Sequence, residues 1–236
     1  AVTVPASVGS VGAEAFYYAS GITDLVIPEG ITAIGAWAVA GCTGLAEVTL
    51  PASLTSLGVD AFYGSALNWA LFNGNAPAVG TAVFDAEASG FTVYFYPAKT
   101  GFTTPTWQGY AAVSLEAPAS IVTWLTGNGF SPGTGLLSDP NGDGVNLLLA
   151  YGLGLDPNQD LSGSLPQPVL AGDSLSLTFQ GDSEGVTYGV EVSDDLTTWT
   201  TTGVTLSEPD PDGMRTAALP AETGGAARFM RLVVGY

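Results

Sequence analysis

A short phrase built around proline recurs three times at the start of this chain, with a period of 23 residues. The copies occupy residues 4–8, 27–31 and 50–54, and an aliphatic-glycine pair and an alanine followed by an apolar residue come after each. A fixed period of roughly 20–50 residues is typical of a solenoid. One such repeat cannot bury its own apolar face and must stack on a neighbour, so the period favours stacked repeats over other folds.

The pattern weakens after the third copy but continues. Val79, Gly80 and Phe84 repeat the earlier positions at a spacing of 22 residues, and the strongly β-prone run 91–97 follows. In each repeat we expect one short strand before the proline and one curled segment after the glycine, too short for a stable isolated helix. One strand and one curl in 23 residues correspond to a leucine-rich-repeat horseshoe.

These residues resemble the BspA-type leucine-rich repeat of bacterial surface proteins. The resemblance covers about residues 3–116 and rests on apolar-Pro, then apolar-x-x-apolar-Gly-x-x-Ala with a large apolar residue, then a small turn and Leu-x-x-apolar. It implies a β-rich solenoid, an exported protein and a role in adhesion or surface coating. It implies no catalytic residues.

Charge and residue usage exclude several classes of function. The chain has 22 acidic residues, four basic residues and no histidine, with a net charge of −18. Four cations cannot form a basic patch, so we expect no binding to nucleic acid or to an anionic membrane. Without histidine, Ser-His-Asp and Cys-His catalysis are impossible. Asp24 and Glu47 occupy equivalent repeat positions, which favours a solvated row over a carboxylate pair for catalysis, and we predict that the protein is not an enzyme.

Three features of the sequence bear on where the protein is located: its apolar runs, its first residues and its single cysteine. No run of about 18 apolar residues is present, so no helix is expected to span a membrane. The chain begins at Ala1, inside a repeat, as a secreted bacterial protein would after its signal peptide is removed and as a trimmed chain also would. The single Cys42 cannot form an intrachain disulfide and fits a small turn residue. We expect an extracellular or cell-surface protein.

Three regions are expected along the chain: a solenoid at residues 1–116, a linker at 117–167 with an Asp/Asn loop and a short helix, and a β-sandwich at 168–236. The helix is expected within residues 145–155, closed by Gly154. Alternating runs at 174–179, 187–192 and 228–234 predict antiparallel strands of the sandwich. The predicted fold class is therefore mainly β.

A candidate metal site lies in the linker. Asp139, Asn141 and Asp143 provide oxygen at loop positions 1, 3 and 5, Gly144 fills position 6, and the carbonyl of Val145 would serve at position 7. Such an oxygen cage suits Ca²⁺. Position 12 is Ala150 rather than a bidentate glutamate, and Asp156 or a water would have to replace it. The alternative is an Asx-rich turn that caps the following helix without metal.

Residues 139–144 also resemble the calcium loops of dockerins and thrombospondin type 3 repeats. Together with the strands that follow, residues 121–236 are similar to a β-sandwich module at the C-termini of exported verrucomicrobial-type proteins. That resemblance implies no activity.

Many aromatic residues fall near the end of the repeats, between residues 69 and 110, and others at residues 16–18 and 62–63. Exposed aromatic strips bind polysaccharides or partner proteins. The alternative, which we favour for most of these residues, is that they close the hydrophobic end of the stack or pack the junction between regions.

Two functions remain. The first is a structural subunit that assembles head to tail with other copies into a fibre or surface layer, through the apolar face of its first repeat. The second is a monomeric surface module for adhesion or for binding glycans or proteins. A poorly charged surface and the absence of a polar cap before the first repeat favour the first. The residues predicted for the self-association face are Val2, Val4, Val8, Val11 and Phe16.

Overall fold

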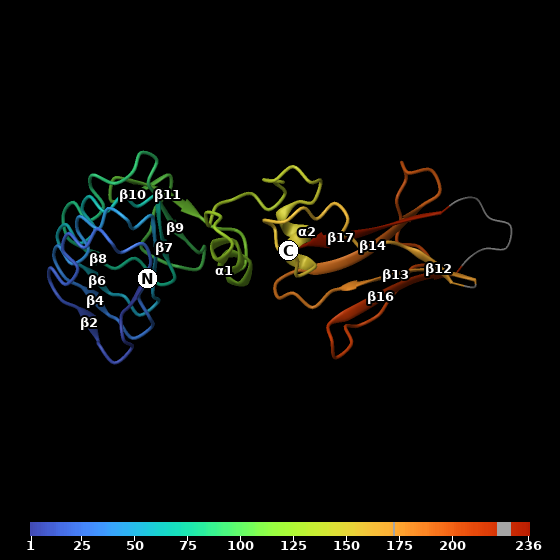
Figure 1. The fold of residues 1–236 in the computed structure, drawn as a ribbon, viewed down its shortest axis with the longest axis horizontal. Helices are drawn as coiled ribbons and strands as arrows, with labels where there is room; N and C mark the ends of the chain where they lie inside the picture. Colours follow the sequence, from blue (N-terminus) through green and yellow to red (C-terminus); the bar gives the residue numbers. More distant parts are fainter. Residues whose placement is uncertain (172, 221–227) are drawn as a thin grey trace. The chain divides into compact units, whose positions relative to one another are not determined.

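The structure is a computed structural model that describes residues 1–171, 173–220 and 228–236. These residues form two compact units, Ala1–Glu116 and Ala117–Tyr236 (Figure 1). Both units are built mainly from β-strands, as the sequence predicts. None of the helices in the described ranges is long and apolar enough to cross a membrane.

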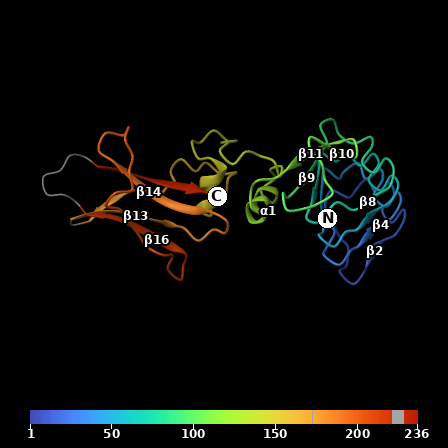
Figure 2. The same ribbon diagram turned by 180° about the vertical axis from the view of Figure 1, so that it is seen from behind.

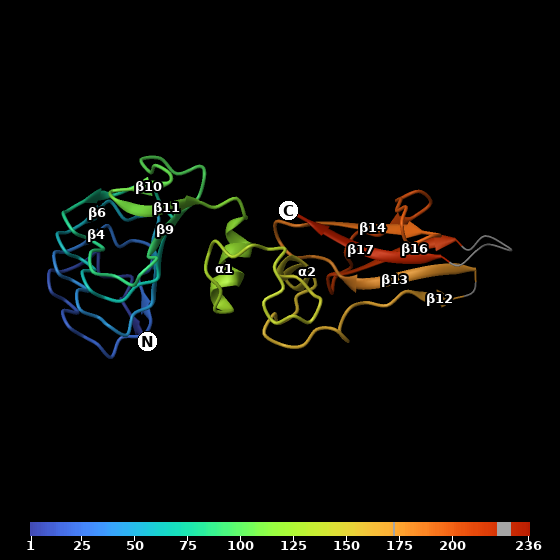
Figure 3. The ribbon, with the colours of Figure 1, turned by 90° about the horizontal axis from the view of Figure 1, so that it is seen from above.

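The first unit is a solenoid whose coils stack from the first repeat to the last (Figure 3). One row of strands carries the apolar residues that precede proline in the repeats. In this row, β1 pairs with β3, β5 with β7, β7 with β9 and β9 with β11, and each pair is parallel. The row contains β1 (Val2–Thr3), β3 (Leu25–Val26), β5 (Glu47–Leu50), β7 (Trp69–Phe72), β9 (Thr92–Phe95) and β11 (Tyr110–Ser114).

Each of the first four coils has a second strand that the sequence analysis did not predict. These strands lie at the position of the aliphatic-glycine pair and form a separate parallel sheet in chain order. They are two residues long, which gives no alternating pattern to detect in the sequence. The row contains β2 (Ser10–Val11), β4 (Ala33–Ile34), β6 (Ser56–Leu57) and β8 (Ala78–Val79).

The inside of the solenoid is a continuous apolar core. Ile31, Leu45 and Phe62 are fully buried in it, and equivalent side chains of successive repeats lie in neighbouring coils. The residues after the aliphatic-glycine pairs form turns, not helices. Coils can approach closely where glycine follows the second strand, because a Cβ atom on Gly58 would lie 2.3 Å from the backbone nitrogen of Ala36.

The second unit begins with two helices, α1 (Ala119–Gly127) and α2 (Leu147–Gly152). α1 was not predicted, whereas α2 lies inside the predicted helical segment. Asn146 caps α2 by accepting a hydrogen bond from the backbone N–H of Leu149. α2 packs against β17 (Phe229–Gly235), so this part of the chain contributes to the core of the unit.

Two antiparallel sheets form the rest of the second unit (Figure 2). In the larger sheet the strand order is β12-β13-β16-β15, and in the smaller one β14 pairs with β17. Leu177, Phe179, Val190 and Ala217 pack between them. The remaining bounds are β12 (Val169–Ala171), β13 (Ser174–Gln180), β14 (Thr187–Ser193), β15 (Thr205–Leu206) and β16 (Met214–Pro220).

Candidate functional site

The first coil presents an apolar hollow of about 330 Å³. The hollow brings together all the residues predicted for self-association, and Pro5 and Ala15 join them. Val8 is 40% exposed, whereas Val4 and Val11 have their side chains turned into the core. The predicted residues that line the hollow are Val2, Val4, Val8, Val11 and Phe16.

The same backbone hydrogen bond joins neighbouring coils at the glycine that follows the second strand. The N–H of Gly35 donates to Val11 O at 2.9 Å, that of Gly58 to Ile34 O at 2.8 Å, and that of Gly80 to Leu57 O at 2.8 Å. Among the described residues, the N–H of Gly12 has no equivalent acceptor from a preceding coil. The first coil therefore combines apolar side chains with an unpaired strand edge, which is a surface suited to strand addition.

The same glycines differ in how much space lies between them and the preceding coil. A Cβ atom on Gly35 or Gly80 would lie 2.5 Å from the backbone nitrogen of Ala13 or Val59 in the preceding coil. A Cβ atom on Gly12 would meet nothing within 4 Å. Among the described residues, Gly12 therefore differs from Gly35 and Gly80 in having open space beside it.

The last coil is covered by residues of this chain. β10 (Thr106–Trp107) pairs antiparallel with β11, and Trp107 is 3% exposed against Phe72 and Phe102. The hydroxyl of Tyr110 donates to Asp85 at 2.7 Å, and its ring packs on Phe84. The aromatic residues at this end therefore close the stack, as the sequence analysis favoured.

Comparison with known proteins identifies the repeats. Residues 1–96 match the BspA type leucine rich repeat region, in six copies. No curated protein and no solved structure matches the chain. BspA-type repeat regions are typically protein-interaction scaffolds rather than enzymes, and the proteins that contain them are typically secreted or attached to the cell surface.

The turns of the first three coils carry a partly exposed aromatic cluster that the sequence analysis only partly anticipated. Trp37 contacts Tyr17 and Tyr63 with 5.9 Å between ring centroids in each pair. Trp37 was missed because the repeat pattern does not place an aromatic residue there. Alignment of position 37 with Glu14 and Asp60, one repeat before and after, would have shown that Trp37 stands where the other repeats have a carboxylate.

One half-buried carboxylate holds a turn of the BspA-type repeats. Glu87 accepts hydrogen bonds from the N–H of Ser65 at 3.2 Å and of Leu67 at 2.6 Å, and from the Ser65 hydroxyl at 3.2 Å. Burial outweighs these bonds and raises the pKa of Glu87 to about 7. Because its partners are backbone groups and one serine of the neighbouring coil, Glu87 fixes the turn.

The predicted metal loop lies in the second unit and is closed by its own hydrogen bonds. Asp139 accepts from the N–H groups of Gly142 at 2.9 Å, Asp143 at 3.3 Å and Gly144 at 2.8 Å. Asp143 accepts from Val145 at 2.8 Å and Leu161 at 2.7 Å, and these bonds lower its pKa, with the Leu161 N–H having the largest effect. Gly144 has a φ of +87°, which suits the sharp turn expected at position 6.

These contacts test how well the loop would hold Ca²⁺. Each carboxylate oxygen has two lone pairs, so bonds to backbone N–H groups leave acceptor capacity for a cation. Within the described ranges, however, no three His, Cys, Asp or Glu side chains lie close enough to hold a metal, which leaves Asp156 outside such a group. Asp156 instead accepts from the N–H of Asn158 at 3.0 Å, and Asn141 donates to the carbonyl of Gln159 at 2.7 Å. The loop thus offers fewer ligands than the six to eight oxygens that Ca²⁺ prefers.

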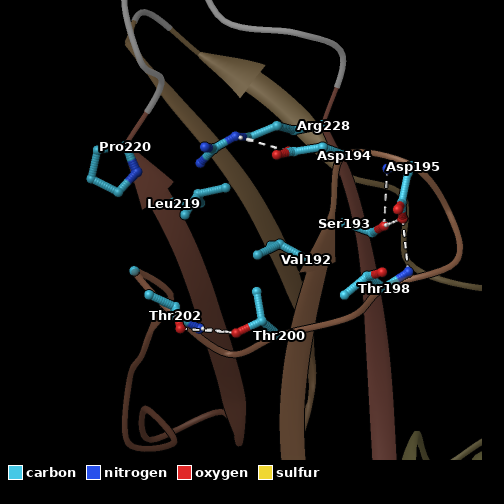
Figure 4. Close-up of a pocket in the computed structure, with 11 residues that line it drawn as sticks. Val192, Ser193, Asp194, Asp195, Thr198, Thr200, Thr202, Leu219, Pro220 and Arg228 are labelled. Carbon is cyan, nitrogen blue, oxygen red and sulfur yellow. Dashed lines mark hydrogen bonds and ion pairs between the residues drawn. The ribbon is translucent and has the colours of Figure 1, made fainter.

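A second hollow, of about 640 Å³, lies at one end of the sandwich (Figure 4). Its charged groups are engaged in structural contacts. Arg228 pairs with Asp194 at 3.3 Å. Asp195 accepts from the N–H of Thr198 at 2.7 Å, and backbone bonds of this kind hold its pKa well below the usual range. This carboxylate is therefore part of a turn rather than a proton donor at neutral pH.

Proposed function

We propose that this protein is an extracellular, non-enzymatic structural protein whose copies assemble through the first-coil face, defined by Val2, Val4, Val8, Val11 and Phe16. The observation that carries the proposal is the coincidence on one face of an apolar hollow with the N–H of Gly12, which has no acceptor among the described residues. Burial of one aliphatic side chain contributes about 1.5–3 kcal/mol, and several such side chains are needed to offset the entropy lost on association.

The opposite end of the solenoid constrains how copies would join. Because β10 and β11 cover the last coil, the first-coil face of one copy cannot stack directly on the core of another copy's last coil. We infer a head-to-tail contact in which this face meets an edge strand of a neighbour. Such a contact joins two different surfaces, so it forms filaments when it does not close into a ring.

An extracellular, non-catalytic role is supported by two further observations. BspA-type repeat regions are typically found on secreted or surface proteins. The chain also has no histidine, and Glu87 and Asp195, whose pKa values are strongly shifted, are both held by structural hydrogen bonds.

The second candidate function is a monomeric adhesion module, and the exposed aromatic cluster around Trp37 favours it. The two functions differ in the face that they use. A variant that blocks the first-coil face would abolish assembly and leave the aromatic cluster intact.

The test uses Gly12→Ala, with Gly163→Ala as a matched control. Neither new methyl group meets an atom within 4 Å in one copy, so both variants should fold. We expect light scattering to show that wild type and Gly163→Ala grow in mass with concentration, whereas Gly12→Ala remains monomeric because its methyl group blocks a stacked neighbour. A wild-type protein that remains monomeric at all concentrations would exclude assembly and favour the adhesion module.

We also propose that the loop of Asp139, Asn141, Asp143 and the Val145 carbonyl binds Ca²⁺ weakly. Bound Ca²⁺ would hold the loop against the start of α2 and would supply no catalytic chemistry. Asp139 Oδ2 and Asp143 Oδ1 each accept a single hydrogen bond, and the second lone pair of each oxygen supports this proposal.

A further inference from the structure

An aromatic and acidic site lies on the turns that follow the second strands of the first three coils. It consists of Glu14, Tyr17, Trp37, Asp60 and Tyr63. Glu14, Trp37 and Asp60 have equivalent positions in successive coils, with φ values of 58°, 58° and 53°. Coil-to-coil bonds link the column, because Glu14 N–H donates to Ala36 O and Trp37 N–H to Val59 O. Position 37 therefore lies between two carboxylate-bearing positions of the column.

The rings of this site remain open to solvent. Tyr17 is 44% exposed and Tyr63 is 41% exposed, and both contact the half-buried Trp37. The Tyr17 and Trp37 planes are perpendicular, so the cluster presents the face of at least one ring and the edge of the other. Glu14 lies close enough to Tyr17 to contribute, after desolvation and Tyr18, to raising the pKa of its hydroxyl.

The backbone at position 37 gives no reason for a tryptophan. A positive φ disfavours bulky residues, and the equivalent positions hold Glu14, Asp60 and Ala82 in the same conformation. The ring is not buried in the core either. A large side chain in an unfavourable, half-exposed position points to a role in binding.

The charge around the site indicates the chemistry of the ligand. Residues 1–116 contain eight acidic residues and one lysine. Aromatic faces and carboxylates both attract cations, and the surrounding negative field draws a positive partner to the surface. The second unit contains an internal example, where the Arg231 guanidinium lies 4.1 Å from the Trp199 ring centroid and 2.7 Å from Glu191.

We propose that Tyr17, Trp37 and Tyr63, with Glu14 and Asp60, bind an arginine- or lysine-bearing segment of a different protein. Another copy of this chain is a poor source of such a segment. Its three arginines contact Glu208, Asp194 and Glu191 of their own unit, and Lys99 is its one lysine. The site shares no residue with the first-coil face, although Glu14 and Tyr17 flank Ala15 and Phe16 of the hollow in the sequence, and it serves recognition of a partner rather than self-association.

The probe is a fluorescent peptide of alternating arginine and serine, with a citrulline-serine peptide of equal length as the neutral control. Fluorescence anisotropy measures binding to the full chain at low and high salt. We expect the arginine peptide to bind, the affinity to fall with salt, and the citrulline peptide to bind at least tenfold more weakly. Equal binding of the two peptides would overturn the proposal.

Two sets of variants locate the binding. The double variant Glu14→Gln with Asp60→Asn should weaken binding about tenfold, whereas Asp24→Asn with Glu47→Gln, which removes the same charge elsewhere in the unit, should change it less than twofold. Equal losses in the two double variants would show unspecific attraction and refute the site. Trp37→Ala, which copies the residue at position 82, should also weaken binding, and Trp37→Phe should retain part of it.

Circular dichroism of each variant checks the fold, and Trp37→Phe keeps the test valid if Trp37→Ala does not fold.

A neutral β-glucan oligosaccharide is the competing ligand. Binding of the oligosaccharide that depends on Trp37, without binding of the arginine peptide, would replace the cationic partner by a glycan. The peptide measurements are repeated in Gly12→Ala. Peptide binding by this variant can then be interpreted whether or not the wild-type protein self-associates.

Discussion

At the scale of single residues, the glycines after the second strands determine how closely the coils stack. Gly58 leaves no space for a side chain, because its Cβ atom would lie 2.3 Å from Ala36 N and 2.6 Å from the carbonyl carbon of Gly35. Gly12 has the same place in the first coil and an empty space beside it. A substitution at Gly58 therefore tests the close contact between coils. The same substitution at Gly12 tests only the effect of a side chain on the backbone of one coil.

We predict that Gly58→Ala destabilises the solenoid by about 1–3 kcal/mol, because the methyl group must displace backbone that cannot move aside easily. Gly12→Ala should leave its stability within about 0.5 kcal/mol of wild type. Hydrogen exchange of the amides in residues 47–72 measures the difference within the full chain. Equal protection in the two variants would contradict the stacking geometry.

Glu87 is the residue whose charge state should change solenoid stability with pH. Its pKa is about 7 in the folded protein and near the usual glutamate value of 4.5 in the unfolded chain, so the folded state binds the proton more tightly. The resulting stabilisation is complete below pH 4.5 and is lost as the pH rises through 7.

We predict that Glu87→Gln removes this dependence. Relative to the variant, the wild type should have a lower melting temperature at pH 8 than at pH 5, since only the wild type must ionise a half-buried carboxyl. Thermal unfolding of both proteins at the two pH values measures the effect. A difference in melting temperature that is the same at both pH values would contradict the role of Glu87.

At the scale of elements, the sequence predicted the strands whose apolar residues recur with the repeat or alternate along the chain. The period of 23 residues places the apolar residues of β3 and β5, and alternation places those of β13, β14 and β17. The short strands β2, β4, β6 and β8 were missed because their pairing comes from the stack and not from their own residues. α1 was missed because its apolar run from Ile121 to Leu125 suits a buried strand as well as a helix.

The candidate site was predictable to the same extent. The five apolar residues of the first-coil face follow from the stacking rule, and the structure brings them together around one hollow. The Trp37 site depends on contacts between turns of different coils, which no local pattern contains. The bonds that occupy the Asp139 loop also depend on distant partners, such as Leu161.

The Asp139 loop allows one prediction for the second unit. If Ca²⁺ binds there, added Ca²⁺ should raise the melting temperature of this unit and excess chelator should reverse the change, because the metal binds the folded loop more tightly than the unfolded chain. Asp143→Asn should reduce the shift. An unchanged melting temperature would identify the loop as a hydrogen-bonded Asx turn without metal.

At the scale of the whole molecule, two properties act together. A net charge of −18 keeps copies apart at long range, while the proposed assembly uses a local apolar contact at the first-coil face. Salt screens the repulsion between exposed charges and leaves apolar burial largely unaffected. Assembly should therefore strengthen as salt is raised, opposite to the salt dependence expected for a cationic partner at the Trp37 site.

The most direct test of the account is amide hydrogen exchange of the first coil as a function of protein concentration. If copies cover the first-coil face, the amides of residues 2–12, including Gly12, should become more protected as concentration rises. The covered last coil at residues 106–114 serves as the internal reference. Concentration-dependent protection confined to residues 2–12 is the predicted result, and exchange of these amides that is the same at every concentration would contradict the proposed assembly.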